Sequence, residues 1–122
     1  MKKVFLISSE KRQTGKTYLA EMIGGSLGRA NYIHASTMTN IYNANTLDCN
    51  VLIIELSKFD TPAEMNAIIN FVNQDYIERN HPREENVITK TPHMILTGTN
   101  LDDFAEQIVD RKSLKVFSIN LK

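Results

Sequence analysis

The segment that decides the fold runs from Val4 to Thr17 and reads VFLISSEKRQTGKT. Its first residues, Val4–Ile7, form an apolar run typical of a buried strand. Its last residues are Gly15-Lys16-Thr17, and the apolar spacing from Tyr18 to Ile23 then predicts a helix. A strand, a loop closing in Gly-Lys-Thr and a helix, in that order, are the parts of a phosphate-binding loop. The chain is therefore a candidate binder of nucleoside triphosphates.

Each part of such a loop has its own task. Successive backbone N–H groups wrap the β-phosphate, and the ammonium of Lys16 reaches the β- and γ-oxygens. The hydroxyl of Thr17 ligates Mg²⁺ at the positive end of the following helix. The residues expected to contact the nucleotide are Gln13, Thr14, Gly15, Lys16, Thr17 and Tyr18.

Glu10 departs from this motif. The usual motif has glycine five positions before Gly15, because the backbone there turns tightly against phosphate. A side chain at that position clashes with phosphate, and a carboxylate also repels it. Two interpretations follow: a loop that still binds nucleotide, or a degenerate loop in a domain that serves as an interaction or assembly module.

Length and charge restrict the function further. A chain of 122 residues predicts one domain, residues 1–122. Fourteen Lys and Arg balance fourteen Asp and Glu, so no global charge draws the protein onto nucleic acid or an anionic membrane. Any contact with a polyanion has to be local.

The location is predicted from the cysteine count and the apolar runs. Cys49 is the only cysteine, which excludes an internal disulfide and fits a reducing compartment. The apolar run after Met1-Lys2-Lys3 ends at Ser8, too soon for a secretory signal. No apolar run approaches the roughly 20 residues that span a bilayer. We expect a cytoplasmic or nuclear protein that is neither secreted nor held in a membrane.

The rest of the chain predicts an α/β fold. Apolar runs rich in β-branched residues recur, and they are continuous, as in parallel strands covered by helices on both faces. These runs are Val4–Ile7, Asn31–His34, Val51–Glu55, His93–Thr97 and Val116–Ile119.

Three helices and a hairpin are expected between the strands. The first follows Gly15-Lys16-Thr17 and would stop at Gly24-Gly25 or Gly28. Asp60 caps a second, in which Pro62 lies in the first turn and the apolar stripe is Met65, Ile68, Ile69 and Val72. A short third helix is expected over 101–109. Tyr76-Ile77 and Val87–Thr89 flank a polar turn and would pair as a hairpin.

Glu55 and Asn100 complete the candidate site. Glu55 ends an apolar strand, where a carboxylate would hold the hydration shell of Mg²⁺ together with Thr17. Alternatively, Glu55 is an ordinary acidic residue at the end of a strand, with no role at a site. Leu56 follows, where many hydrolysing members of this fold carry a second acid, and Asp60 is more simply a helix cap. Asn100 would contact the γ-phosphate or orient water, or would belong to an ordinary turn.

In this order the pieces resemble the ATPase, superfamily 3 helicase-like domain of rolling-circle replication initiator (Rep) proteins of small circular single-stranded DNA viruses and related plasmids. Gly15–Ala20 is similar to the second half of the family's loop. Val51–Lys58 is similar to its strand with a terminal acid, and Lys90–Asn100 to its Pro-Pro-His-strand-Ser-Asn segment.

The resemblance implies a P-loop NTPase three-layer sandwich with a five-stranded, mainly parallel sheet. It implies ATP and Mg²⁺ as cofactors, Lys16, Glu55 and Asn100 as catalytic residues, and Thr17 with Glu55 at the metal. It also implies a homo-oligomeric ring, expected to be a hexamer, around single-stranded DNA that the hairpin contacts.

The chain also departs from the family. Ser9, Glu10, Arg12 and Gln13 replace the family's Gly, Pro, Gly and Asn. The closing Asp-Arg-aromatic run falls on Lys112-Ser113-Leu114, with its arginine missing or displaced to Arg111. The family's nicking endonuclease has no counterpart here, as expected of an excised domain or a stand-alone relative. The expected function is ATP binding and hydrolysis in a Rep-like helicase, and the alternative is the module without turnover.

Overall fold

A parallel sheet forms the centre of the structure. The structure is a computed structural model, and it describes residues 2–9, 15–34, 49–56, 62–79, 87–99, 101–108 and 114–121. Within these residues the sheet has five strands in the order β2-β3-β6-β1-β7, and every pairing is parallel. The strands are β1 (Lys2–Ser9), β2 (Ala30–His34), β3 (Val51–Glu55), β6 (His93–Gly98) and β7 (Leu114–Leu121). All five predicted runs are therefore strands, and the parallel sheet is confirmed.

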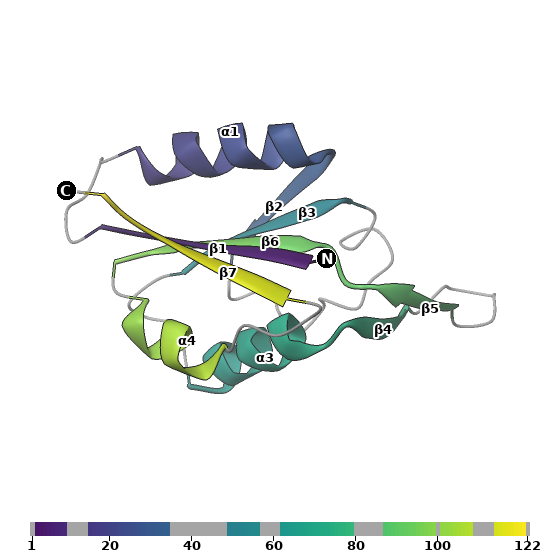
Figure 1. The fold of residues 1–122 in the computed structure, drawn as a ribbon. Helices are drawn as coiled ribbons and strands as arrows, with labels where there is room; N and C mark the ends of the chain where they lie inside the picture. The colour runs from purple at the N-terminus through teal and green to yellow at the C-terminus, as the bar shows by residue number, and fades with distance from the viewer. Residues whose placement is uncertain are drawn as a thin grey trace.

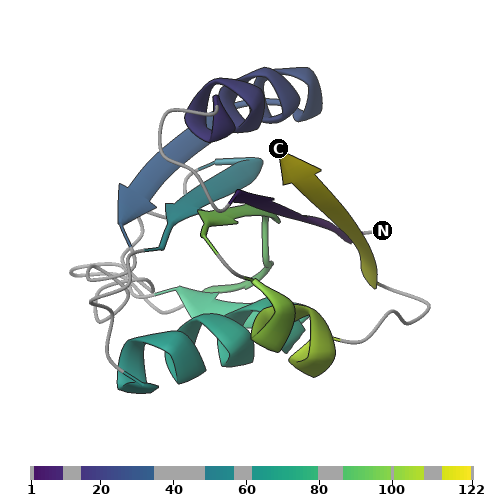
Figure 2. The ribbon, with the colours of Figure 1, turned by 90° about the vertical axis from the view of Figure 1, so that its left-hand side faces the viewer.

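Helices cover both faces of this sheet. Helix α1 (Lys16–Leu27) lies on one face, and α3 (Pro62–Asn73) and α4 (Asp102–Gln107) lie on the other (Figures 1 and 2). Side chains of β3 alternate between the two sides: Val51 and Ile53 belong to the core under α1, whereas Leu52 and Ile54 belong to the core against α3. This alternation explains why the strand reads as a continuous apolar run.

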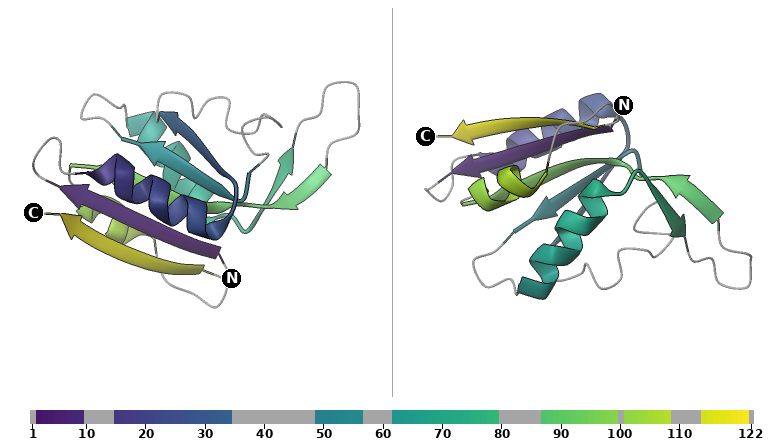
Figure 3. Two further views of the ribbon diagram at one scale, coloured as in Figure 1. Left: turned by 90° about the horizontal axis from the view of Figure 1, so that it is seen from above. Right: turned by 60° about the horizontal axis from the view of Figure 1, so that its bottom comes forward.

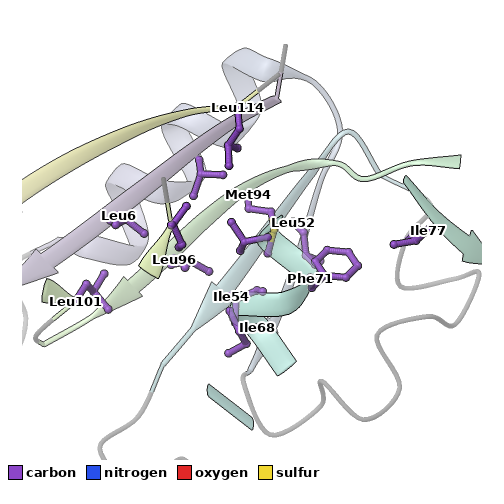
Figure 4. Close-up of a cluster of buried hydrophobic side chains, with 13 residues drawn as sticks. Leu6, Leu52, Ile54, Ile68, Phe71, Ile77, Met94, Leu96, Leu101 and Leu114 are labelled. Carbon is purple, nitrogen blue, oxygen red and sulfur yellow. The ribbon is translucent and has the colours of Figure 1, made fainter. Parts of the chain in front are cut away.

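The core on the α3 side is the larger of the two described clusters (Figure 4). Ile68 and Val72 of the predicted stripe are fully buried there, and Met65 and Ile69 pack against it half-buried. Phe71, which the predicted stripe did not include, is also fully buried and is the largest such side chain. Asp60, the predicted cap, lies outside the described residues.

Helix α1 packs closely against the sheet through Gly24. A Cβ atom at Gly24 would lie 3.2 Å from Cβ of Ala30 and 3.3 Å from Cδ1 of Ile53. The helix ends at Gly28, whose φ of 141° lies in the region that favours glycine. The prediction of a stop at Gly24-Gly25 is wrong, because α1 continues through both glycines and packs on the sheet at Gly24, while the stop at Gly28 is confirmed.

The predicted hairpin is present and lies apart from the main sheet. Strands β4 (Tyr76–Arg79) and β5 (Val87–Lys90) pair in an antiparallel manner, with Tyr76 opposite Lys90. The hairpin extends from the end of the sheet opposite to the start of α1 (Figures 1 and 3). The described helices include none that is long and apolar enough to cross a membrane.

Candidate functional site

The carboxyl end of the sheet is where those predicted site residues that the structure describes lie. Because the strands are parallel, β1, β3 and β6 all end at the edge where α1 begins. Ligands of open α/β sheets bind outside this edge. Gly15, Lys16 and Thr17 lie here at the start of α1, and Glu55 lies at the end of β3.

Gly15 makes the turn from the loop into α1. Its φ of 85° and ψ of 18° are left-handed, and its carbonyl accepts the first helical hydrogen bond from the N–H of Leu19 over 2.9 Å. A Cβ atom at Gly15 would meet nothing described within 4 Å, so backbone conformation rather than space favours glycine here. No acidic residue stands in the first turn of α1, so its positive end is suited to an anion.

The next three residues lie on the first turn of α1 with different exposure. Lys16 is half-buried, and Thr17 and Tyr18 are exposed. With 69% of its surface exposed, Tyr18 would offer phosphate its backbone N–H. Gln13 and Thr14, the other predicted loop contacts, lie outside the described residues.

Tyr32 of β2 joins two of the predicted residues. Its hydroxyl donates a short hydrogen bond to Oε2 of Glu55, and the side chain of Thr17 lies within hydrogen-bonding reach of the same hydroxyl. Thr17 and Glu55, which the sequence assigned to the same metal, thus lie within hydrogen-bonding reach of one intervening hydroxyl. Tyr32 itself was not predicted.

The phenol of Tyr32 keeps its proton strongly. Burial, followed by the hydrogen bond and the negative charge of Glu55, raises its pKa to about 12, and the charge of Glu21 adds to this. The hydrogen bond from Thr17 acts in the opposite direction, because a donor stabilises the phenolate. Tyr32 is therefore a neutral donor to Glu55 at physiological pH.

These oxygen groups suit Mg²⁺. Mg²⁺ is usually held by one or two protein oxygens together with phosphate oxygens and water, rather than by a full set of protein ligands. A hydroxyl from Thr17 and a carboxylate from Glu55 match that donor set. In the described part of the chain no group of three or more His, Cys, Asp or Glu side chains is placed to hold a metal ion.

The end of β3 is held tightly against β6. Leu56 donates its N–H to the carbonyl of Thr97 over 2.8 Å, and its side chain packs half-buried against the larger core. A Cβ atom at Gly98 would lie 3.0 Å from Cδ2 of Leu101, so glycine lets the chain after β6 approach closely. Asn100, the predicted sensor of the γ-phosphate, lies outside the described residues.

A cleft opens at the opposite edge of the sheet. It encloses about 610 Å³ and is lined by Lys2, Leu27, Cys49, Asn50, Asp75, Tyr76, Lys90, Thr91, Pro92 and His93. The Nδ1 atom of His93 accepts a hydrogen bond from the N–H of Lys3 over 2.9 Å. Burial lowers the pKa of His93, and the positive charges of Lys3, the N-terminus and Lys2 lower it further. This cleft is separate from Lys16, Thr17 and Glu55.

The signal for Tyr32 in the sequence is only indirect. Its register partner in β3 is Ile53, and Glu55 is the next residue of β3 on the same face. Diagonal neighbours on one face of a sheet are within reach of a long aromatic side chain. The contact follows only once β2 is known to pair with β3, and the sequence does not state strand order.

Similarity to known proteins is confined to solved structures. No protein-family model and no curated protein matches the chain. An A-form apo structure of the C-terminal region of NrS-1 has a TM-score of 0.56 at 15% identity and covers 96% of this chain. A second apo structure of that region has a TM-score of 0.52 at 13% identity over 99% of this chain.

NtrX from Brucella abortus, solved in complex with ADP, has a TM-score of 0.50 at 15% identity over 98% of this chain. The chain spans 28% of the two NrS-1 chains and 32% of the NtrX chain. Identities this low show the fold alone. The fold is the predicted three-layer α/β sandwich, with a sheet that is wholly parallel in the described residues, as in P-loop NTPase-like structures.

Proposed function

We propose that this chain binds Mg²⁺–ATP and hydrolyses it, as the ATPase part of a Rep-like helicase that acts on single-stranded DNA. The observation that carries the proposal is that Thr17 and Glu55 both lie within hydrogen-bonding reach of the Tyr32 hydroxyl. Lys16 and Gly15, whose backbone is left-handed, adjoin Thr17 at the start of α1. A cation, a hydroxyl and a carboxylate at the positive end of a helix are what a metal-bound triphosphate requires.

Each residue has a distinct role in this proposal. Lys16 neutralises the β- and γ-phosphates, and its ammonium stabilises the charge that develops on them during transfer. Thr17 ligates Mg²⁺, and Glu55 orients the water molecules of the metal. Asn100 senses the γ-phosphate and orients the attacking water. The ADP bound to NtrX, a protein of similar fold, supports a nucleotide as the ligand.

Calorimetric titration with ATP and with a non-hydrolysable analogue, each with and without Mg²⁺, tests the proposal. Lys16→Ala is expected to abolish Mg²⁺-dependent binding, because its positive charge is lost from the phosphates. Lys115→Ala is the matched control, since Lys115 is exposed near the amino end of β7. Equal affinity in Lys16→Ala and wild type would contradict the proposal.

The hairpin is the proposed contact for single-stranded DNA. It lies at the end of the sheet opposite Lys16 and presents the exposed side chains of Ile88 and Lys90. Because the whole chain is neutral, a DNA contact depends on such local cations. Lys90→Ala is expected to weaken binding of a fluorescent oligothymidine without changing ATP affinity. Sedimentation with DNA and the ATP analogue tests the ring, expected to be a hexamer.

The degenerate module remains the second candidate. Glu10 in the loop and Leu56 beside Glu55 favour it, and Leu56 is committed to packing and to its backbone hydrogen bond with Thr97. Binding of ATP without turnover would support the module. Phosphate release that depends on both Mg²⁺ and Lys16 would exclude it.

A further inference from the structure

We propose that Tyr32 is a positioning residue that couples Glu55 to the metal-binding hydroxyl of Thr17. This inference rests on the proposed function. The residues come from separate elements, Thr17 from α1, Tyr32 from β2 and Glu55 from β3. Because Tyr32 donates its single O–H to Glu55, its oxygen can only accept from Thr17, so Thr17 is the donor of the second hydrogen bond.

The number of O–H groups in this chain of hydrogen bonds determines which part of the Thr17 hydroxyl is available to a metal. A hydroxyl has one proton to donate and two lone pairs to offer. Thr17 uses its O–H to donate a hydrogen bond to Tyr32, and Tyr32 uses its own O–H to donate a hydrogen bond to Glu55. Both lone pairs of the Thr17 oxygen are thereby left to accept, and a cation would bind through one of them.

The charge of Glu55 strengthens both bonds. A hydrogen bond to a carboxylate is stronger than one between neutral groups, and successive hydrogen bonds polarise one another. Negative charge at Glu55 therefore increases electron density on the oxygen of Tyr32 and, through it, on the oxygen of Thr17. This is how an outer partner of a ligand tunes metal binding, and loss of such a partner typically lowers metal affinity by about 10- to 100-fold.

The length of tyrosine suits this role. Tyr32 lies beside Ile53, so its ring has to extend along the sheet to reach Glu55 two residues further on. Tyr32 is 38% exposed, and Thr17 is exposed as well. Removing the hydroxyl oxygen in Tyr32→Phe thus leaves the packing of the ring intact and deletes only the link between Thr17 and Glu55.

The test is a Mg²⁺ titration of the binding of a fluorescent ATP analogue to wild type, Tyr32→Phe and Tyr76→Phe. Tyr76 is an exposed tyrosine on the hairpin and supplies the matched control. Tyr32→Phe is expected to raise the Mg²⁺ concentration at half-saturation about ten-fold or more. Its affinity for nucleotide without Mg²⁺ is expected to stay within about two-fold of wild type, because Lys16 and the start of α1 are unchanged.

The outcomes separate the two proposals. If Tyr32→Phe binds nucleotide normally and its Mg²⁺ concentration at half-saturation is unchanged or lower, this inference alone is overturned. A lower concentration identifies the phenol as an obstacle to the metal. Wild type that binds no nucleotide overturns the proposed function and this inference with it.

Discussion

The ammonium of Lys2 donates a hydrogen bond to the hydroxyl of Thr91 over 2.8 Å, across 89 positions of the sequence. It also donates to the carbonyl of Gln74 over 2.9 Å, and the hydroxyl of Thr91 donates to the same carbonyl over 2.8 Å. Thr91 further donates its N–H to the carbonyl of Asp75 over 3.0 Å. These bonds fasten the start of β1 to both strands of the hairpin at its base.

Lys2→Met is expected to destabilise the protein by about 1–3 kcal/mol, because a buried hydroxyl and carbonyl lose a charged donor. Lys2 is only 8% exposed, so water does not readily replace the ammonium. Urea unfolding measures the change. The exposed Lys115→Met serves as control and is expected to stay within about 0.5 kcal/mol of wild type. Equal losses in the two variants would refute a role for the buried bonds.

The adjacent glycines of α1 are expected to respond in opposite directions. A Cβ at Gly25 meets nothing described within 4 Å, so Gly25→Ala should stabilise the helix by about 0.5–1 kcal/mol. At Gly24 a larger side chain is forced into Ala30 and Ile53, so Gly24→Val should destabilise by about 1–3 kcal/mol. Thermal unfolding of both variants measures this, and a stable Gly24→Val would argue against close packing of α1.

Gly15→Ala is expected to lower stability by about 1–2 kcal/mol, since the left-handed backbone is unfavourable for a residue with a Cβ. No described atom would clash with that Cβ, so the effect is conformational. Gly15→Asn is the informative control, because asparagine tolerates this region better than alanine. Chemical unfolding should rank wild type first, Gly15→Asn second and Gly15→Ala last. Equal losses from Asn and Ala would point to a different cause.

His93 is expected to make stability depend on pH. Because its pKa is lowered in the folded protein, the unfolded chain binds the proton more readily. Stability from this residue is therefore complete above the unfolded pKa of about 6.5 and is lost as pH falls through the lower folded pKa. His93→Asn keeps an acceptor for the N–H of Lys3 and should flatten this part of the curve. Denaturation between about pH 5 and 7 compares the two, and parallel curves would contradict the prediction.

The sequence predicted those features that depend on local pattern. Strands and helices follow from apolar runs and from caps, and Gly15-Lys16-Thr17 follows from the chemistry of phosphate loops. The fate of Gly24 and Gly25 was missed, because tertiary packing overrode a local stop signal. Lys2 and Tyr32 were missed because their contacts depend on which strands and loops lie side by side.

The strand order imposes an order of assembly on the chain. Strands β2 and β3 pair with each other, whereas β1 lies between β6 and β7, both of which come late in the sequence. During synthesis the apolar residues Val4–Ile7 emerge before β6 and β7, the strands with which they pair. Such non-local pairing slows folding and leaves a strand edge open to aggregation. The strand that leads into Gly15-Lys16-Thr17 thus stays without its strand partners over much of the growing chain.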